Sequence, residues 1–378
     1  MSICFFNVSQ PESNAHFAIS FHIGLSLLSY SKYRARGTLG GLVIILIVAS
    51  LYSLSAGAID TSMFETLRAT AQFLGLVPMD QDNNSLPQIL GQIRIPRLIL
   101  AIIVGGGLAI TGTVLQALFR NPMADPGLLG VSSGAAFGAA ATIVFGVSFF
   151  AQAFAVFGNW LLILVAFAGS FISLSVVYRL ATFNRRTDIP TMLLAGVAVN
   201  AITGAMIGLL SYIASDTQLR DLIFWSLGSL GITDWWKLGA TALIATPACF
   251  ALLFHARALN ANLLGESEAR HLGFDVEKIK KRLIILVALV VSVVVAVSGV
   301  IGFVGLVVPH LLRLVVGPDH RLLLPASALA GAILLIMADI IARTIVAPAE
   351  IPIGIITAVL GGPFFLGLLI RHKRKQVF

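Results

Sequence analysis

The sequence predicts an all-α integral membrane protein with about ten transmembrane helices. Of its 378 residues, 58% are apolar and only 11% are charged, whereas soluble domains are about half apolar and about a quarter charged. The charges lie in clusters separated by apolar runs of about 20 residues, the length of helix that crosses a bilayer. Because the hydrocarbon core holds no water, the backbone of each run has to satisfy its own hydrogen bonds, so the runs are expected to be helices.

The first half of the chain holds five apolar runs. The predicted spans are residues 39–58, 95–119, 127–148, 160–180 and 191–213. Between the first two, the polar segment 59–93 carries apolar residues at helical spacing and is predicted to form a short amphipathic helix on the outer surface. A short apolar stretch before the first span is too brief to cross a bilayer.

The second half holds five more runs. The predicted spans are residues 238–254, 283–300, an irregular descent followed by a short helix that begins at Pro309, 322–343 and 353–370. The eighth is irregular because Gly299, Gly302 and Gly305 interrupt it. Non-helical backbone at this depth is tolerated only where protein buries it or where it lines a cavity. Residues 214–237 are expected to form an outer loop with a short helix and a Trp pair at the membrane boundary.

These runs divide the chain into three parts. Residues 1–37 form an extension that is expected to be interfacial or disordered, residues 38–372 form a single transmembrane domain, and residues 373–378 form a basic cytoplasmic tail. The extension lacks a basic n-region and a small-residue cleavage site, so it does not match a secretory signal.

The distribution of basic residues predicts the orientation. Ten spans place 19 Lys and Arg on the side that holds both termini and six on the other side. Cytoplasmic loops carry the excess of Lys and Arg, so both termini are expected in the cytoplasm. The net charge of +8 is therefore a topology signal rather than a nucleic-acid footprint.

A faint internal repeat accompanies this count. Thr111-Gly112 is followed by Pro122, eleven residues after the Thr, and Ser298-Gly299 is followed by Pro309 at the same interval. The two stretches run in opposite directions through the membrane. Spans one to five and six to ten are then an inverted repeat, a common plan for transporters, although chance also explains so short a pattern.

Several functions are excluded by what the sequence lacks. It contains no G-x-x-x-x-G-K-[ST] motif, so ATP is not expected to bind here. An ion-coupled secondary transporter needs several polar ligands within its spans, and Asp339 is the only acidic residue there. Cys4 and Cys249 suggest neither a disulfide nor a metal site. His271 and His310 are expected to be packing or surface residues, and no catalytic, cofactor or metal site is predicted.

Four stretches carry a resemblance to a known family. They read RIPRLILAIIVGGGLAITGTVLQALFRNPMADPGLLGVSSGA, GESEARHLGF, GFVGLVVPHLLR with DHRLLLP, and ADIIAR with AEIPIGIITAVLGGPFF. Over roughly residues 40–372 the chain resembles the permease subunit of type II ABC importers for iron complexes, haem and cobalamin. The resemblance implies a homodimer of ten-helix subunits in the bacterial inner membrane. Each subunit docks on a cytoplasmic ABC ATPase, which holds ATP and Mg, and a periplasmic binding protein delivers the substrate.

The resemblance also implies where the binding protein docks. Arg94 and Arg97 lie at the outer end of span two, and Arg343 lies at the outer end of span nine. In the family, arginines at these positions face carboxylates of the binding protein, and such pairs steer and orient a partner. The alternative is that they anchor the membrane boundary or pair with local acids, because Asp339 lies one helical turn before Arg343.

On the inner side the resemblance implies two gates and a coupling segment. Asn121 and Met123 map to one gate, and Thr191, in the turn that starts at Ile189, maps to the other, where Pro190 makes the match loose. Within the coupling loop 257–282, the stretches LNANLL and ESEARHL are predicted to form short helices. The candidate ATPase contacts are Gly265, Glu266, Ala269, Arg270 and Gly273. The alternative is a solvated loop.

The substrate is the least determined feature. The stretch RNPMADPGLLGVSSGA is more similar to haem permeases than to cobalamin permeases. Haem is therefore the predicted substrate, with ferric siderophores and vitamin B12 as alternatives.

Overall fold

The computed structural model describes residues 37–57, 61–78, 85–146, 151–158, 160–184, 186–231 and 233–376. These residues are almost entirely helical, which confirms the predicted all-α class. The extension predicted at residues 1–37 lies outside the described residues except for Gly37, where the first described helix begins.

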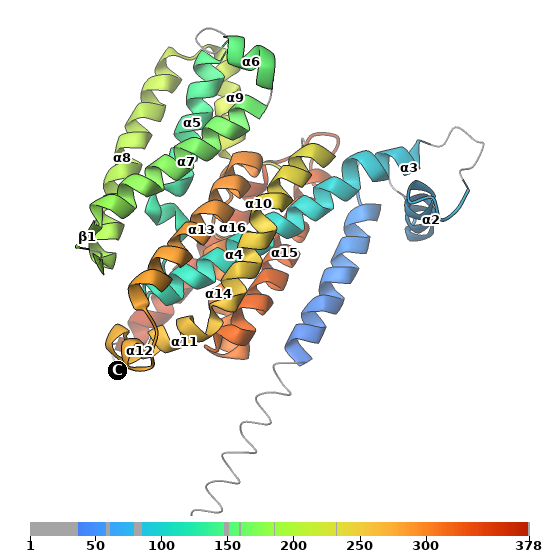
Figure 1. Cartoon of the computed structure of the whole chain (residues 1–378). Coiled ribbons are helices and arrows are strands. Elements are labelled where there is room, and N and C mark those ends of the chain that lie inside the picture. Colours follow the sequence, from blue (N-terminus) through green and yellow to red (C-terminus); the bar gives the residue numbers. More distant parts are fainter. Residues whose placement is uncertain are drawn as a thin grey trace, which may run out of the picture.

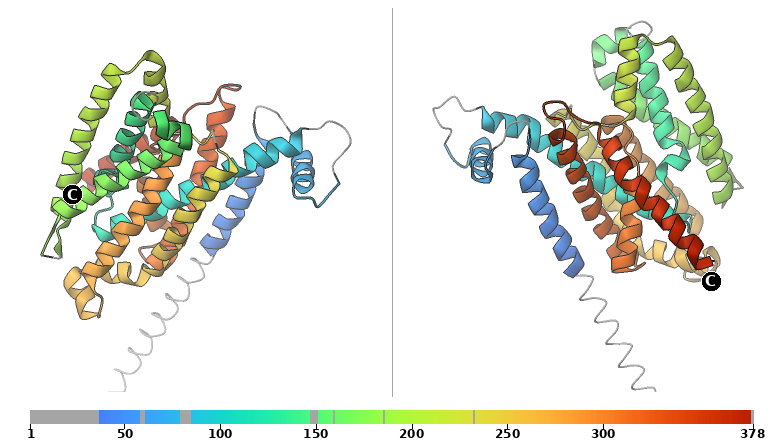
Figure 2. Two further views of the ribbon diagram at one scale, coloured as in Figure 1. Left: turned by 45° about the horizontal axis from the view of Figure 1, so that its top comes forward. Right: turned by 180° about the vertical axis from the view of Figure 1, so that it is seen from behind.

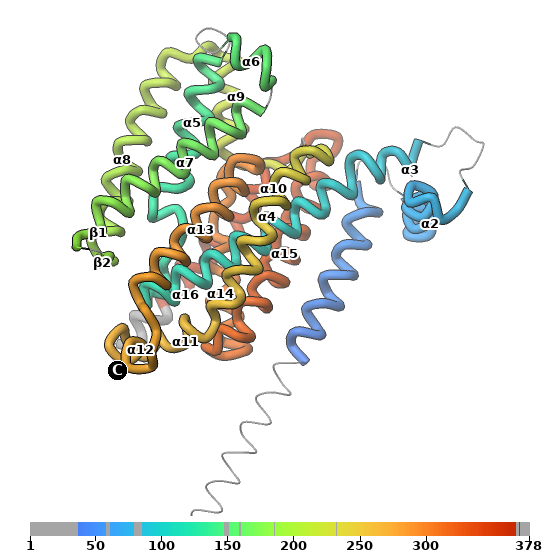
Figure 3. The backbone as a smooth tube through the Cα atoms, viewed as in Figure 1, coloured from blue at the N-terminus to red at the C-terminus, as the bar shows by residue number. Residues whose placement is uncertain are grey.

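The first half contains helices and one short hairpin. In chain order the elements are the first helix Gly37–Ser55, α2 Met63–Phe73, α3 Leu86–Ile89, the π-helix η1 Leu90–Arg94, α4 Ile95–Leu118, the 3₁₀ turn η2 Pro126–Leu129, α5 Val131–Phe145, α6 Ala151–Phe157, α7 Trp160–Leu180, β1 Thr182–Phe183, β2 Arg186–Thr187, α8 Ile189–Ile213 and α9 Asp216–Ser226. The hairpin is antiparallel, with Thr182 opposite Thr187 (Figure 3).

The second half contains only helices among its described residues. They are α10 Trp235–Phe254, α11 Ala256–Leu264, α12 Glu266–His271, α13 Val276–Ser298, α14 Val304–Val316, α15 His320–Thr344 and α16 Ile353–Gln376.

Length and composition identify the helices that are able to cross a membrane. In the described parts of the chain, seven helices qualify: 37–55, 86–118, 160–180, 189–213, 235–254, 276–298 and 320–344. Shorter apolar helices cover residues 131–145, 304–316 and 353–367. The chain is therefore a helical membrane protein, as predicted.

Helix α4 lies at the centre of the bundle. It runs obliquely between α10, α13, α14 and α15, while α5 to α9 form a group on one side and the first helix lies on the other (Figure 1). Figure 2 shows α15 and α16 from behind. Helix α4 is apolar all round and buried along most of its length, which is the pattern of a core helix. Its neighbours present mainly Leu, Val, Ile and Ala to it.

Glycines bring α4 close to two neighbours. A Cβ on Gly105 would fall on the carbonyl oxygen of Gly331 in α15, and a Cβ on Gly331 would fall on that of Gly105. A Cβ on Gly112 would fall on the carbonyl oxygen of Gly305 in α14, and a Cβ on Gly305 would crowd the oxygen of Leu108 in α4. Small residues at such crossings let backbones approach closely, and close packing is what holds helices together in a bilayer.

Gly105→Ala is therefore expected to destabilise the protein by about 1–3 kcal/mol, because the methyl group has to push α15 away from α4. The thermal midpoint of the detergent-solubilised protein measures this. Gly239→Ala in α10 is the matched control, since no atom lies within 4 Å of the Cβ it would add. An equal midpoint for the two variants would contradict the packing account.

The start of α14 corrects one prediction. The helix was expected to begin at Pro309, yet it begins at Val304 and Pro309 lies inside it. A proline within a helix leaves the carbonyl four residues earlier without its usual donor. Here Gln116 of α4 supplies a replacement, because its Nε2 donates to the oxygen of Gly305 at 3.3 Å. A side chain from a distant segment therefore permits the helix to start earlier.

Other boundaries differ from the prediction in smaller ways. The span predicted at 95–119 belongs to a continuous helix over residues 86–118 that includes η1, and α5 ends at Phe145 rather than at residue 148. The helix α6 and the β1–β2 hairpin were not predicted. The span at 160–180, the amphipathic helix within 59–93 and the two short helices within 257–282 were predicted correctly.

Candidate functional site

The bundle has two ends that differ in chemistry. One end, called the α9 end, carries α2, α6 and α9, and the other, called the α12 end, carries α11, α12 and the β1–β2 hairpin (Figure 1). The three arginines singled out in the sequence lie at the α9 end. The predicted gate and coupling residues lie at the α12 end.

Arg97 forms the centre of an ion cluster at the α9 end. Its Nε and Nη2 contact Asp339 Oδ1 of α15 at 2.9 and 2.8 Å. Its Nη1 and Nη2 also donate to the two carboxylate oxygens of Glu350 at 2.8 and 3.0 Å. This planar, bidentate geometry is the one that arginine forms best with carboxylates. The start of α4 is thus joined to α15 and to the loop before α16.

Arg343 and Arg94 join the first helix to this cluster. Arg343 Nε lies 3.3 Å from Asp339 Oδ2, and its Nη2 donates to the oxygen of Ser53 at 2.6 Å. Arg94 Nη1 donates to the oxygen of Leu54 at 2.6 Å. The pairing of Arg343 with Asp339, expected as one alternative, is therefore present. The three arginines are only 6–7% exposed.

Glu350 is the exposed member of the cluster. Its side chain is 43% exposed, and the hydrogen bonds from Arg97 lower its pKa below the ordinary value of 4.5. A lowered folded-state pKa means that the ionised carboxylate stabilises the fold above pH 4.5, and that this contribution is lost as the pH falls through the folded-state pKa. Because the Glu350 side chain is exposed, its bond with Arg97 is the part of the cluster that solvent and other molecules reach most easily.

A cavity of about 630 Å³ opens beside this cluster. It lies between α5, α7 and α9 on one side and the end of α13 and the loop before α16 on the other. Its lining is mixed, with Trp225 and Phe154 beside Asp221, Lys237 and Glu350. Mostly apolar walls with a few polar groups are typical of sites for small organic molecules.

The loop after α4 carries the first predicted gate at the α12 end. Asn121 Oδ1 accepts a hydrogen bond from the backbone N–H of Met123 at 2.9 Å, which closes a tight turn. The loop then rests on α8, because Asn200 Nδ2 donates to the oxygen of Gly127 at 3.1 Å. A predicted gate loop is thus fastened to α8.

The second predicted gate lies in the first turn of α8. Asp188 caps this helix by accepting from the Thr191 backbone N–H at 2.9 Å. Its carboxylate also accepts from the Thr191 hydroxyl, and together these bonds lower the pKa of Asp188. Pro190 lies at the start of the helix, where proline is favoured because its missing N–H is not needed.

The predicted coupling segment folds into α11 and α12, which cross the α12 end. Ala269 is buried against Ala261 and Val276, so it supports the helix from inside, whereas Arg270 is half exposed. Two leucines that the sequence prediction did not single out are exposed, Leu264 at 67% and Leu272 at 60%. Both side chains are therefore accessible at the α12 end.

Four further polar residues of these sites were missed by sequence reasoning. They are Gln116, Asn200, Lys280 and Glu350. Gln116 and Asn200 gave a usable signal, because polar residues within apolar spans are functional candidates. Among the described residues, no group of three His, Cys, Asp or Glu is placed to hold a metal ion.

Comparison with known proteins gives this arrangement a family. Residues 45–371 match the FecCD transport family. The chain belongs to this family. The hemin transport system permease protein HmuU of Yersinia pestis is 44% identical over 345 residues, which cover 91% of this chain and 98% of HmuU. The vitamin B12 import system permease protein BtuC of Klebsiella pneumoniae is 38% identical over 351 residues, or 93% and 98% of the two chains.

A solved structure supports the FecCD fold. A metal-chelate type ABC transporter in an inward-facing conformation is 32% identical and superposes with a TM-score of 0.74 over 88% of this chain and 98% of its own. The resemblance drawn from the sequence motifs is thus confirmed at the level of the family and of an ABC importer permease. The roles predicted for individual residues of this FecCD protein stay predictions.

Proposed function

We propose that this chain is the permease subunit that moves haem through the bacterial inner membrane in an ATP-driven importer. The assignment of haem as substrate rests on the match to a hemin permease, which extends over nearly the whole of both chains. Vitamin B12 and ferric siderophores are the alternative substrates, because B12 permeases match at similar coverage. An ion-coupled secondary transporter is disfavoured because Asp339 is the single buried acidic residue within the described helices, and two arginines already pair with it.

We infer that all ten apolar helices cross the membrane, the seven long ones together with the three shorter ones. The two halves of the chain are then an inverted repeat with the pathway near the midplane. The excess of Lys and Arg at the α12 end supports a cytoplasmic location of that end and of both termini. Two copies of the chain form the homodimer that the family's plan requires.

The two ends then serve different partners. A cytoplasmic ABC ATPase, which supplies ATP and Mg, docks on α11 and α12 through Gly265, Glu266, Ala269, Arg270 and Gly273. The exposed Leu264 and Leu272 extend that surface. A periplasmic binding protein docks at the α9 end, where Arg94, Arg97 and Arg343 lie. Because these guanidinium groups are engaged, a partner carboxylate has to replace Glu350 on Arg97 before it forms the same bond.

Reconstitution tests the function directly. The permease, the ATPase and the binding protein encoded with it are placed in lipid vesicles, and uptake of haem, a ferric siderophore and cobalamin is compared with and without ATP. We expect ATP-dependent uptake of haem that requires all three proteins. Uptake driven by an ion gradient without the ATPase would contradict the importer proposal, and preference for another substrate would contradict haem alone.

A further inference from the structure

One lysine near the start of α13 is unlike its neighbours. Residues 278–282 read KIKKR, and three of its four basic side chains are exposed, whereas Lys280 is only 3% exposed. An ammonium group is costly to bury unless it is paired and hydrogen-bonded. The partners of Lys280 therefore show what this position does.

The ammonium group of Lys280 meets three different elements. Its Nζ lies 2.7 Å from Glu266 Oε1 at the start of α12 and 3.4 Å from Glu277 Oε1 on α13. It also donates to the backbone oxygen of Thr187, the last residue of β2, at 3.3 Å. The side chain thus links the predicted coupling helix to the hairpin that leads into α8.

Both backbone polar groups of Thr187 are hydrogen-bonded to side chains of α13. Its backbone N–H donates to Glu277 Oε2 at 3.1 Å, while its oxygen accepts from Lys280. The next residue, Asp188, caps α8 by binding Thr191. Contacts therefore run without a break from Glu266 through Lys280 and Thr187 to the predicted gate residue Thr191.

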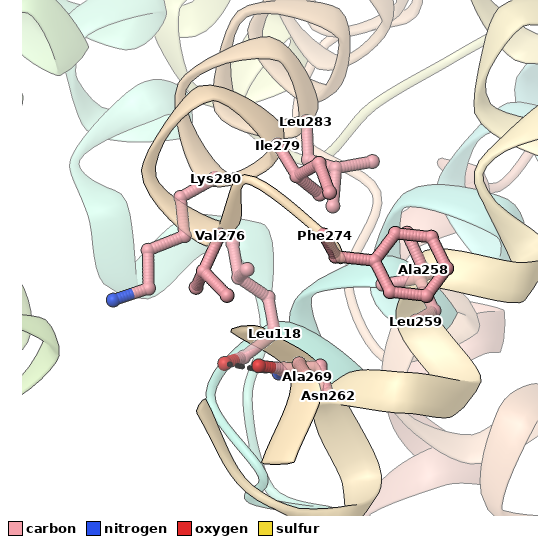
Figure 4. A pocket seen from close by; sticks show the side chains of 10 residues that line it. All are labelled: Leu118, Ala258, Leu259, Asn262, Ala269, Phe274, Val276, Ile279, Lys280 and Leu283. Carbon is pink, nitrogen blue, oxygen red and sulfur yellow. Dashed lines mark hydrogen bonds between the residues drawn. The ribbon is translucent and has the colours of Figure 1, made fainter. Parts of the chain in front are cut away.

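The other predicted gate is tied to the same segment. Asn262 of α11 donates from Nδ2 to the oxygens of Ala117 and Leu118 at 3.1 and 3.4 Å, which fastens α11 to the end of α4 just before Asn121. Figure 4 shows Asn262 beside Leu118, with the carbon stem of Lys280 lining the same small pocket and its amine pointing out of it. Both predicted gate loops are thus connected to α11 and α12 by buried polar side chains.

Lys280 is better suited to this link than the nearby Arg270. Arg270 lies 3.8 and 3.7 Å from Glu266 and Glu277, and its side chain is 50% exposed. Exposed ion pairs contribute little, whereas the ammonium group of Lys280 is buried and its contact with Glu266 is only 2.7 Å long. A displacement of Glu266 is therefore passed to the β1–β2 hairpin mainly through its short contact with Lys280.

We propose that Lys280 is a positioning residue of transport, whose buried ammonium group joins the coupling helix α12 to the β1–β2 hairpin and so passes a movement of α12 to the start of α8. This inference rests on the proposed importer function. It adds to that function the physical connection between the ATPase surface and one predicted gate.

The test uses Lys280→Met in the complete complex of permease, ATPase and binding protein in lipid vesicles. Methionine replaces the unbranched stem of the lysine and lacks only the terminal ammonium group. The two glutamates stay partly exposed with Arg270 beside them, so folding is expected to survive. Substrate imported per ATP hydrolysed is expected to fall by a factor of about 5–150, the usual range for a coupling between two sites. Lys278→Met, which removes a lysine that is 75% exposed on the same helix, is expected to change nothing.

A pair of spin labels separates coupling from mere stability. One label is placed at Phe183 on the hairpin and one at His271, the last residue of α12, and both positions are exposed. In the unmodified complex both labels are expected to shift when ATP binds. In Lys280→Met the label at His271 is expected to shift while the label at Phe183 does not.

A second variant covers the case in which Lys280→Met does not fold. Glu266→Ala removes the contact between Lys280 and α12 and leaves Lys280 bound to Glu277 and Thr187. It is expected to give the same loss, and the double variant no further loss. Normal import per ATP in either variant, or an unchanged shift at Phe183, would overturn the role of Lys280. Absence of ATP-driven import by the unmodified complex would instead overturn the proposed function.

Discussion

Replacing Asp339 with alanine is expected to destabilise the protein by about 3–5 kcal/mol, the range found when one partner of a buried ion pair is removed. Asp339 is almost fully buried and touches both Arg97 and Arg343. Its loss leaves Arg97 with Glu350 alone and Arg343 with oxygens of the first helix. Two buried positive charges then lie close together without the carboxylate between them.

The thermal midpoint of the solubilised protein measures this effect. Asp221→Ala, which removes an exposed acid on α9, is the matched control and is expected to lie within about 0.5 kcal/mol of the unmodified protein. Asp339→Asn is expected to fall between them, since the amide oxygen still accepts from Arg97 but carries no charge. Equal midpoints for Asp339→Ala and Asp221→Ala would show that the cluster does not hold the α9 end together.

The helices were predictable because each one crosses a medium that lacks water. An apolar run of the right length has no alternative to a helix there, so α7 was found at its observed bounds, residues 160–180. Boundaries failed where a distant residue decides them. The start of α14 depends on Gln116 of α4, which lies 189 positions before its acceptor Gly305. No local pattern around Pro309 records that contact.

The candidate sites were predictable in position but not in bonding. The motifs placed Arg94, Arg97 and Arg343 together, and the structure does bring their segments to one end of the bundle. Asp339, one helical turn before Arg343, was recognised as a possible partner. The other acceptors are mostly backbone oxygens and one glutamate in a loop, groups that leave no pattern in a sequence. Lys280 was counted only as one of 19 basic residues that set the topology, because burial distinguishes it from its neighbours and composition does not.

Replacing residues 266–273 with a Gly/Ser linker of equal length is expected to reduce ATP-dependent uptake to the level seen without ATP. Helix α12 has only six residues, and helices that short form only when packing supports them. Here the support is Ala269, which is buried against α11 and the start of α13. A linker removes that contact, the bond from Glu266 to Lys280 and the exposed Leu272 together. The ATPase then loses the ordered surface that α12 supplies.

The control is the same linker in place of residues 151–158, a stretch of equal length at the α9 end. Its helix α6 buries no side chain, so binding of the ATPase and the stimulation of ATP hydrolysis by loaded binding protein are expected to persist. In the 266–273 variant that stimulation is expected to disappear, although the permease stays folded around α4. Normal uptake and stimulation with this linker would show that the ATPase acts elsewhere, because a flexible chain transmits neither position nor force to Lys280 and α8.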